Sequence, residues 1–330
     1  MKIYVDAYLA KNLGDDLFIN ILTNRYPEHK FYAISKGEKG YDTKNFKVYS
    51  NVYMFKALKK FQWEKHLANY YDTVVTIGGS MFMERGDTNR DFSLGKNKRY
   101  VLGINFGPYK TQEYYNNIHN MLSNVEDVCF RDKYSYNLFK DLPNVRQAAD
   151  IVFSKDMSNI KNTNRKRAII SIISPKDKIN KKYQKQYEEK MLELISFLIE
   201  KGYEICLMSF CKIEHDEEEI EEIYSKIPEK QRRNVEKYYY DGNVEEALNT
   251  IADSQLVVGG RFHANIIGLC LGKSILPVLY SDKTLHVLQD MQIDTPIIDI
   301  RNLESFDIKS ITDDDLTRHY DVEKQKEDAQ

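Results

Sequence analysis

Short apolar runs alternate along the chain with longer segments in which apolar side chains recur every three or four positions. Short runs rich in valine and isoleucine predict buried strands, and the longer recurrence predicts helices with one apolar face. The expected strands are 2–8, 31–35, 46–49, 72–77, 100–106, 127–130, 168–173, 203–210, 235–240, 254–258, 274–278 and 297–300. The expected helices are 17–26, 52–68, 134–139, 182–201, 215–227, 244–252 and 262–271. This alternation indicates an α/β protein with parallel sheets.

A polar, basic segment without periodicity, 154–167, separates two halves that each repeat the strand–helix pattern. Two such halves predict two Rossmann-like domains facing each other across a cleft, with ligand held between the carboxyl edges of both sheets. We expect an N-terminal domain over 1–155, a C-terminal domain over 165–312 and a polar tail over 313–330.

Composition narrows the class. With 42% hydrophobic and 30% charged residues, the chain has the balance of a soluble globular protein. A formal net charge of −2 argues against a dedicated nucleic-acid binder. The four cysteines lack metal-ligand spacing and three of them lie in apolar runs, as reduced thiols of a cytoplasmic protein do. The chain begins directly with a strand-like run, so we expect no signal peptide and a cytoplasmic location.

Two segments allow a second interpretation. The stretch 52–68 mixes aromatic and lysine residues, which suits either a helix packed on a sheet or peripheral contact with the inner face of a membrane. The acidic run 216–219 contains the residue types of a metal site, but its place in an expected helix favours a solvated face. We therefore expect no metal, and any membrane contact to be peripheral.

The strongest candidate site is the turn between the expected strand 254–258 and the expected helix 262–271. Gly259 and Gly260 permit a tight turn, and in a parallel sheet that turn lies at the carboxyl edge where ligands bind. The free N–H groups at the helix start, the guanidinium of Arg261 and the imidazole of His263 together favour an anion. The plainer alternative is that Arg261 pairs with a structural acid and His263 caps the helix.

Three further places carry polar residues next to expected strand ends. Asn12, Gly14 and Asp15 lie in the loop before the first helix, where Asp15 or the adjacent Asp16 could instead cap that helix. A glycine-rich turn that contains Gly79 follows the strand 72–77. Arg131 lies at a helix start, where a salt bridge is the alternative to ligand binding, and Asp132 is the expected N-cap of that helix.

Together these residues resemble a known family. The segment Asn243–Tyr280 is similar to the C-terminal signature of the polysaccharide pyruvyl transferases. Further matches occur upstream in the family's order, and they are Asn12-Leu13-Gly14-Asp15, Arg131-Asp132 with Ser135, and Ala149-Asp150-Ile151-Val152-Phe153. The resemblance extends from about Asn12 to about Met291 and implies a two-domain fold like that called GT-B.

The resemblance also implies an activity. Members of this family use phosphoenolpyruvate as donor and a sugar with two hydroxyls as acceptor, in a glycan or its lipid-linked precursor. The product is a cyclic pyruvate ketal, and phosphate is released. Phosphoenolpyruvate is thus a co-substrate, and no further cofactor is expected.

Roles follow residue by residue from the resemblance and from the chemistry that this reaction needs. Arg261, Arg131 and Gly260 are expected to bind the donor, and His263 to contact it and act as the general acid. An electropositive helix start disfavours a protonated His263, which a trianionic donor would counter. Asp15 is expected to orient or deprotonate a sugar hydroxyl. The residues expected to contact the acceptor are Asn12, Gly14, Asp15 and Gly79. Asp150 and Lys283 also match family positions, with no role assigned.

Departures from the family pattern leave other functions open. Gly260 stands where the family often has serine, Asp16 where it often has glutamate, and Lys273 where a smaller residue or proline is commoner. One alternative is a nucleotide-sugar glycosyltransferase of the same fold, for which Asp282 and Asp290 have the spacing of a paired acidic motif. Another is a catalytically silent scaffold of a glycan-assembly complex.

Overall fold

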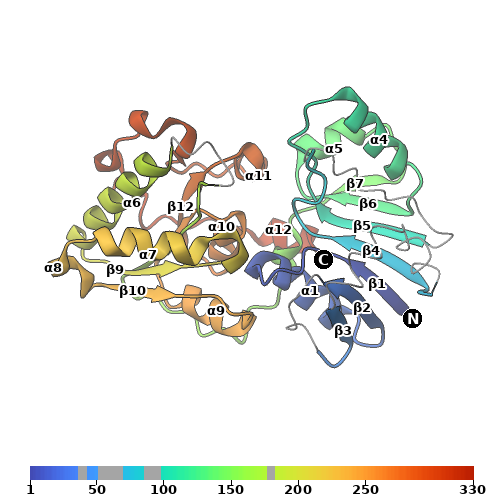
Figure 1. Ribbon diagram of the computed structural model, residues 1–330, viewed down its shortest axis with the longest axis horizontal. Coiled ribbons are helices and arrows are strands. Elements are labelled where there is room, and N and C mark those ends of the chain that lie inside the picture. The colour runs from blue at the N-terminus through green and yellow to red at the C-terminus, as the bar shows by residue number, and fades with distance from the viewer. Residues whose placement is uncertain (36–42, 51–69, 85–97, 177–182) are drawn as a thin grey trace. The chain divides into compact units, whose positions relative to one another are not determined.

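The computed structural model describes residues 1–35, 43–50, 70–84, 98–176 and 183–330. The chain divides into two compact units (Figure 1). The first unit contains Met1–Ala10, Asp15–Ile151 and Asp328–Gln330, and the second contains Lys11–Gly14 and Val152–Glu327. The second unit thus begins at Val152, inside the expected N-terminal domain, and includes four residues from near the N-terminus. The helix expected over 52–68 lies outside the described residues.

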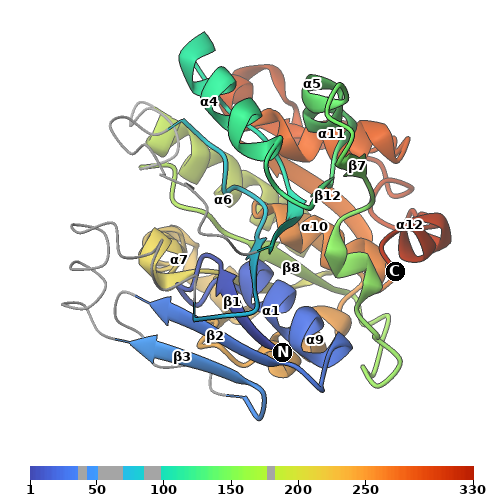
Figure 2. The ribbon, with the colours of Figure 1, turned by 90° about the vertical axis from the view of Figure 1, so that its right-hand side faces the viewer.

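The first unit is built on a seven-stranded parallel sheet in the order β3-β2-β1-β4-β5-β6-β7. Figure 2 shows β1, β2 and β3 lying side by side. The strands are β1 (Lys2–Asp6), β2 (Lys30–Ser35), β3 (Phe46–Ser50), β4 (Thr73–Ile77), β5 (Lys98–Ile104), β6 (Asp127–Phe130) and β7 (Val145–Gln147). Each of the first six overlaps an expected strand.

Three helices are described in this part of the chain, α1 (Leu13–Arg25), α4 (Gln112–Leu122) and α5 (Lys133–Phe139). α4 and α5 lie beside β6 and β7 in Figure 1, and their apolar side chains share one core with β5 and β6. The sequence did not predict α4, because its only buried side chains are Ile118 and Leu122 among tyrosines and asparagines. Thr111 caps its start by accepting a hydrogen bond from the Tyr114 amide at 3.2 Å.

The second unit is built on a six-stranded parallel sheet in the order β10-β9-β8-β11-β12-β13. The strands are β8 (Arg167–Ser171), β9 (Glu204–Met208), β10 (Val235–Tyr238), β11 (Leu256–Gly259), β12 (Ser274–Leu279) and β13 (Ile298–Asp299). Its helices are α6 (Tyr183–Glu200), α7 (Asp216–Lys226), α8 (Glu229–Arg232), α9 (Val244–Ala252), α10 (Phe262–Cys270), α11 (Asp282–Asp290) and α12 (Glu323–Asp328).

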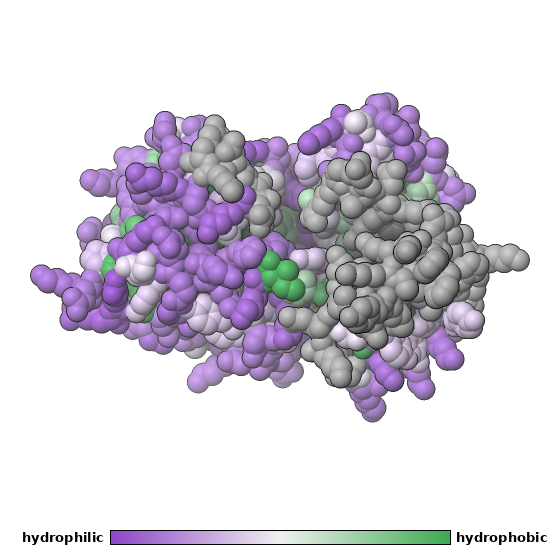
Figure 3. All heavy atoms as spheres, viewed as in Figure 1, coloured by the Kyte–Doolittle hydropathy of each residue, from purple (hydrophilic) through white to green (hydrophobic). Residues whose placement is uncertain are grey.

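Both faces of this second sheet are covered, which explains why its strands read as continuous apolar runs. Leu256 and Val258 of β11 belong to a core that includes side chains of α6 and α7. Val257 points to the other face, where it lies against Gly268 of α10. Polar side chains cover the outer surface of α6 and α7, so the visible face of this unit is mostly hydrophilic (Figure 3).

The segment expected as a polar tail, 313–330, contains two buried side chains. Leu316 joins the core of the second unit, and Val322 is also buried. His319 makes a hydrogen bond through Nδ1 to the Gly272 carbonyl at 2.6 Å. The last three residues belong to the first unit, where the Asp328 carboxylate accepts a hydrogen bond from the Ala149 amide. The segment 313–330 was expected to be a polar tail because most of its residues are polar, and these two apolar positions were overlooked.

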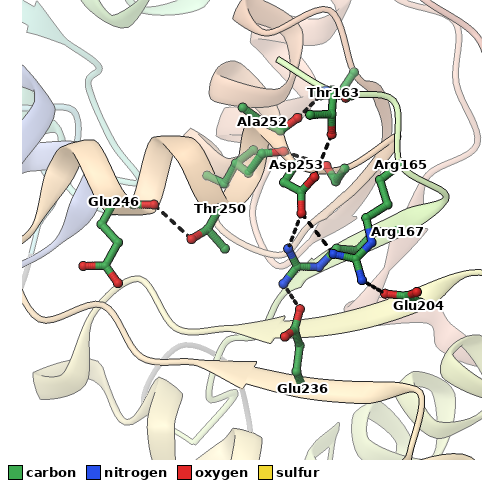
Figure 4. Close-up of polar contacts among 12 residues, drawn as sticks. Thr163, Arg165, Arg167, Glu204, Glu236, Glu246, Thr250, Ala252 and Asp253 are labelled. Atoms are coloured by element: carbon green, nitrogen blue, oxygen red, sulfur yellow. Dashed lines mark hydrogen bonds and ion pairs between the residues drawn. The ribbon is translucent and has the colours of Figure 1, made fainter. Parts of the chain in front are cut away.

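Ion pairs connect neighbouring strands at the amino edge of the second sheet (Figure 4). Arg167, whose side chain is only 8% exposed, pairs with Glu236 and with Asp253. Arg165 pairs with Asp253 as well, and with Glu204 at the start of β9. These pairs join the starts of β8, β9 and β10 to the end of α9, at the edge of the sheet opposite the glycine turn.

Lys273 lies just before β12 and is buried. Its ammonium group donates hydrogen bonds to the carbonyls of Ala252 and Thr163. Burial lowers the pKa of Lys273 to about 8, although the charge of Asp253 opposes the shift. The lysine that departs from the family pattern therefore acts as a structural tie between α9 and the start of the second unit.

Candidate functional site

The order of strands reverses between β1 and β4 in the first sheet and between β8 and β11 in the second. In open parallel sheets, the loops beyond such a reversal are where ligands bind. The structure puts every predicted site residue at or beside the carboxyl edge of one of the two sheets. Asp15, Gly79 and Arg131 belong to the first unit, and Asn12, Gly14, Gly260, Arg261 and His263 belong to the second.

The turn after β11 is packed tightly against the end of β8. The Gly260 amide donates to the Ser171 carbonyl at 3.2 Å, and the Arg261 amide lies 3.3 Å from the Ser171 hydroxyl oxygen. A Cβ atom on Gly260 would lie 2.4 Å from the Ser171 carbonyl oxygen. Because backbone stands so close, glycine is required at this position. This explains why the chain lacks the serine that is common in the family.

Asn265 is a residue of this turn that the sequence analysis missed. It is fully buried in α10, and its Nδ2 donates to the carbonyls of Gly259 and Arg261 at 3.0 and 3.3 Å. A Cβ atom on Gly259 would lie 2.2 Å from Asn265 Oδ1, so the amide group occupies the space beside that glycine. The sequence signal that could have revealed these hydrogen bonds is an asparagine inside an apolar helix, four residues after Arg261.

Arg261 is buried and bound to two carboxylates. Its Nε and Nη2 donate to the two oxygens of Asp216, with Nε at 3.0 Å, and its Nη1 donates to Glu214 at 2.5 Å. Burial alone would lower the pKa of the guanidinium, but the charges of Asp216 and Glu214 outweigh it and hold that pKa well above its usual value. The pairing with structural acids, set out as the plainer alternative, is what the structure shows.

Asp216 is the centre of this arrangement. It is fully buried at the start of α7, and besides Arg261 it accepts hydrogen bonds from the amides of Phe210 and Cys211, both at 3.0 Å. It therefore ties the end of β9 to the turn after β11. The expectation of a solvated face over 216–219 is wrong for two of its four residues, because Asp216 and Glu219 are 0% and 1% exposed.

Glu219 adds a second buried carboxylate in α7. The side-chain amide of Gln184 donates to both of its oxygens at 2.7 Å. Burial raises the pKa of Glu219 to about 7, the hydrogen bonds from Gln184 oppose the shift, and the charge of Glu188 adds to it. This part of the second unit therefore holds several acidic groups close to Arg261.

The segment Lys11–Gly14 belongs to the second unit, although we expected it in the N-terminal domain. The Leu13 amide donates to the Phe210 carbonyl at 3.0 Å, and Asn12 forms an antiparallel bridge with Cys211. A Cβ atom on Gly14 would lie 1.8 Å from Nδ1 of His263, so the imidazole ring rests directly on this glycine. Within the second unit, the structure therefore brings Gly14 into contact with His263.

Asp15 lies on the first unit's side of the same motif. It is half-buried, and a Cβ atom on Gly78 would lie 3.3 Å from its Oδ1. α1 begins two residues earlier, at Leu13, so Asp15 and Asp16 lie inside the first helical turn and neither is the cap. Carboxylates in that turn are favoured by the helix dipole. Asp15 is thus placed beside the glycine turn that follows β4.

Arg131 is buried beside the same glycine turn in the first unit. Its Nη1 donates to Asp150 at 3.0 Å and its Nη2 to the Asn105 side chain at 2.9 Å. A Cβ atom on Gly79 would lie 2.5 Å from the terminal nitrogens of Arg131, so the guanidinium packs on the Gly79 backbone. The salt bridge set out as the alternative is present, and Gly79 is needed to make room for it.

The residues next to Arg131 have a structural role that the sequence predicted. Asp132 is the N-cap of α5 and accepts a hydrogen bond from the Ser135 amide at 2.7 Å, which confirms the prediction. Its other oxygen accepts from the Ser135 hydroxyl at 3.0 Å, and that hydroxyl accepts from the Phe106 amide at 2.8 Å. This family-like segment therefore joins α5 to the end of β5.

Asp282 and Asp290 do not form a paired acidic site. They are the first and last residues of α11, which places them about 12 Å apart along the helix axis. Asp282 is also paired with Arg301 at 2.7 Å. The geometry gives no support to the acidic motif of the glycosyltransferase alternative.

Two further features are absent from the described part of the chain. Among residues 1–35, 43–50, 70–84, 98–176 and 183–330, no helix is long and apolar enough to cross a membrane. Within the same ranges, no group of three or more histidine, cysteine, aspartate or glutamate side chains is arranged to hold a metal ion.

Solved structures with the same arrangement of two Rossmann-like domains identify the fold class. The chain is similar to UDP-GlcNAc 2-epimerase from Methanocaldococcus jannaschii, with a TM-score of 0.59, 9% identity, and coverage of 100% of this chain and 97% of that one. Anabaena HepE, solved with UDP and glucose, has a TM-score of 0.54 at 9% identity, covering 99% and 94%. WaaG, a glycosyltransferase involved in lipopolysaccharide biosynthesis, has a TM-score of 0.50 at 11% identity, and the match covers 100% of this chain and 93% of that one. The fold is of the GT-B class.

Within that fold class, the sequence defines the family. Residues 11–282 match the model of the polysaccharide pyruvyl transferase family, and the chain belongs to this family. It is also similar to the amylovoran biosynthesis protein AmsJ of Erwinia amylovora. The two are 24% identical over 286 residues, which cover 77% of this chain and 68% of that protein. Family membership assigns the chain to transferases that modify glycans.

Proposed function

We propose that this protein transfers pyruvate from phosphoenolpyruvate to a sugar of a glycan or of its lipid-linked precursor. The observation that carries the proposal is the family match over residues 11–282, which includes all the site residues named above. In the reaction, the methylene carbon of phosphoenolpyruvate gains a proton and becomes a methyl group. Two sugar hydroxyls then form bonds to the central carbon, phosphate leaves with its oxygen, and the hydroxyl protons balance the proton consumed and the phosphate released.

The donor would bind at Arg261. Asp216 holds the Nε and Nη2 edge of the guanidinium and is fully buried, so it stays in place. Glu214 is 26% exposed and accepts from Nη1. An incoming carboxylate or phosphate would therefore replace Glu214 on Nη1. Arg261 is also the N-cap residue of α10, and its own side chain makes no capping hydrogen bond to that helix.

His263 follows Arg261 by two residues and is half-buried. We assign to it contact with the donor and delivery of the proton to the methylene carbon. Asp15 would orient or deprotonate the sugar hydroxyl, with Asn12 and Gly79 as further acceptor contacts. Arg131 is the second candidate cation for the donor, although its terminal nitrogens already bind Asp150 and Asn105.

The experiment is phosphate release from phosphoenolpyruvate in the presence of a panel of free and lipid-linked glycans, with the ketal detected by its methyl signal in NMR. We expect saturable binding of phosphoenolpyruvate, weak or no binding of UDP- or GDP-sugars, and activity that survives EDTA. Tight binding of a nucleotide sugar without binding of phosphoenolpyruvate would replace this proposal with glycosyl transfer. Activity lost in EDTA and restored by magnesium or manganese would contradict the metal-free reaction.

A further inference from the structure

Gly14 and His263 are in direct contact within the second unit, although they lie 249 positions apart in sequence. The atoms nearest to a Cβ built on Gly14 are Nδ1, Cγ and Cε1 of the imidazole, at 1.8, 2.4 and 2.6 Å. The nearest atoms belong to the Nδ1 side of the ring, and Nε2 is not among them. The Nδ1 side of the His263 imidazole therefore packs on the Gly14 backbone, and Nε2 lies farther from it.

The backbone that carries Gly14 is itself held in place. The Leu13 amide is bonded to the end of β9 through the Phe210 carbonyl, and the Asn12–Cys211 bridge extends that pairing. The Asn12 side-chain oxygen also accepts a hydrogen bond from the Gly14 amide at 3.1 Å. Phe262, the preceding residue, is oriented edge to face with the imidazole, with ring centroids 5.0 Å apart. The imidazole thus contacts both a fixed glycine and an aromatic ring.

The helix itself gives no reason for a glycine here. Gly14 is the second residue of α1, and its φ lies outside the left-handed range that favours glycine. Alanine is the better helix former and glycine the poorer one. The space that a side chain would need is instead taken by the imidazole, so contact with His263 explains the glycine.

We propose that Gly14 is a positioning residue for His263, and that its lack of a side chain sets the orientation in which the imidazole presents Nε2 to the donor. This replaces the acceptor contact expected of Gly14 from the sequence. The catalytic part of the proposal rests on the proposed function, but the contact between glycine and imidazole does not. It also gives the Asn12–Asp15 motif a role at the donor histidine.

The test is a double-mutant cycle on Gly14→Ala and His263→Ala, read by thermal unfolding and by NMR of the histidine rings. Alone, Gly14→Ala should lower the unfolding midpoint and move the imidazole signals of His263, while those of His119 and His319 stay in place. In the His263→Ala background, the same alanine should raise the midpoint, because the ring is gone and alanine is the better helix former. If Gly14→Ala does not fold, the double variant still should.

The catalytic readout uses phosphoenolpyruvate. Gly14→Ala should lower kcat by about 10²-fold, with KM for the donor changed less, because misplacing a catalytic group by an ångström has effects of that size. The pH profile of kcat should also shift, which a purely structural defect would not cause. If the His263 signals move in Gly14→Ala but the wild-type protein shows no pyruvyl transfer, the contact is supported and the proposed function is not. An active Gly14→Ala enzyme with wild-type signals and kcat would overturn the positioning role, and so would a double variant that fails to fold.

Discussion

Arg131 in the first unit and Arg261 in the second each follow the carboxyl end of a strand in a parallel sheet, β6 and β11 respectively. Both are buried, and each donates to an aspartate that is almost completely buried, Asp150 or Asp216. They differ in their second partner. Arg131 binds the neutral amide of Asn105, whereas Arg261 binds the carboxylate of Glu214.

This difference indicates which arginine can exchange a protein carboxylate for an anionic ligand. Asp150 is fully buried, so displacing it from Arg131 would break a buried ion pair. Arg261 binds two carboxylates, of which Asp216 is fully buried and Glu214 is partly exposed. An anionic ligand could therefore take the place of Glu214 while Asp216 stays bound to the guanidinium.

The largest expected effect comes from removing the counter-charge in each region. Asp150→Asn should lower the free energy of unfolding by about 3–5 kcal/mol, because a buried ion pair is broken from one side. Asp216→Asn should cost less, about 1–3 kcal/mol, since Glu214 still balances Arg261. Urea unfolding followed by circular dichroism gives both values. Equal losses would mean that the two clusters do not differ in charge balance.

The next effect concerns Glu219, a buried glutamate of α7 in the second unit. The folded pKa of Glu219 is raised to about 7, above the ordinary value of 4.5, so its contribution to stability is complete below about pH 4.5. That contribution is lost as the pH rises through about 7, by roughly 2–3 kcal/mol. Glu219→Gln should remove this part of the pH dependence. Unfolding free energies measured from pH 4.5 to 8 check it, and an unchanged slope in the variant would show that other groups cause it.

Much of the fold could be predicted from the sequence, because two parallel sheets covered on both faces leave continuous apolar runs. β6 and α9 have the predicted bounds, 127–130 and 244–252. α4 was missed because tyrosine and asparagine obscure its narrow apolar side. No helix was predicted for α11, where Asp282 and Asp290 were considered only as a paired acidic motif and the buried Thr284, Val287 and Leu288 were overlooked.

The site was only partly predictable. The glycine turn drew attention to Arg261 and His263, because a strand, a turn and a helix are local in sequence. The sequence did not predict which residues contact them. Asp216 lies 45 positions from Arg261, and its burial at the start of an acidic helix has no local signal. The contact between Gly14 and His263 is equally non-local, since it depends on Lys11–Gly14 joining the second unit.

A smaller effect separates the two arginines as donor ligands. Arg261→Lys keeps the positive charge but loses the planar fork, so donor affinity should fall by tens-fold, equivalent to about 1.5–3 kcal/mol. Arg131→Lys should weaken the donor less, because Asp150 and Asn105 already occupy its terminal nitrogens. Calorimetric titration with phosphoenolpyruvate measures both. A larger loss in Arg131→Lys would move the donor site to the first unit.

Turnover distinguishes donor contact from proton transfer at the neighbouring histidine. If His263 is the acid, His263→Gln should leave donor affinity within a few-fold while single-turnover rates fall by roughly 10²–10⁴. If it only contacts the donor, affinity and rate should fall together. Near-normal turnover would remove His263 from the acid role and direct the search to the substrate phosphate or Asp15.

The smallest expected effect tests the comparison of the two arginines most specifically, because it is a gain in donor affinity. Glu214→Gln keeps the shape of the side chain but removes its charge, and Asp216 still balances Arg261. An anion should then meet less competition at Nη1, so phosphoenolpyruvate should bind several-fold more tightly, equivalent to about 1 kcal/mol. Glu218→Gln is the matched control, since this exposed glutamate of the same helix region lies beside His215 instead of Arg261. Unfolding should change little in either variant. Weaker donor binding in Glu214→Gln alone would show that Glu214 supports the bound donor instead of competing with it.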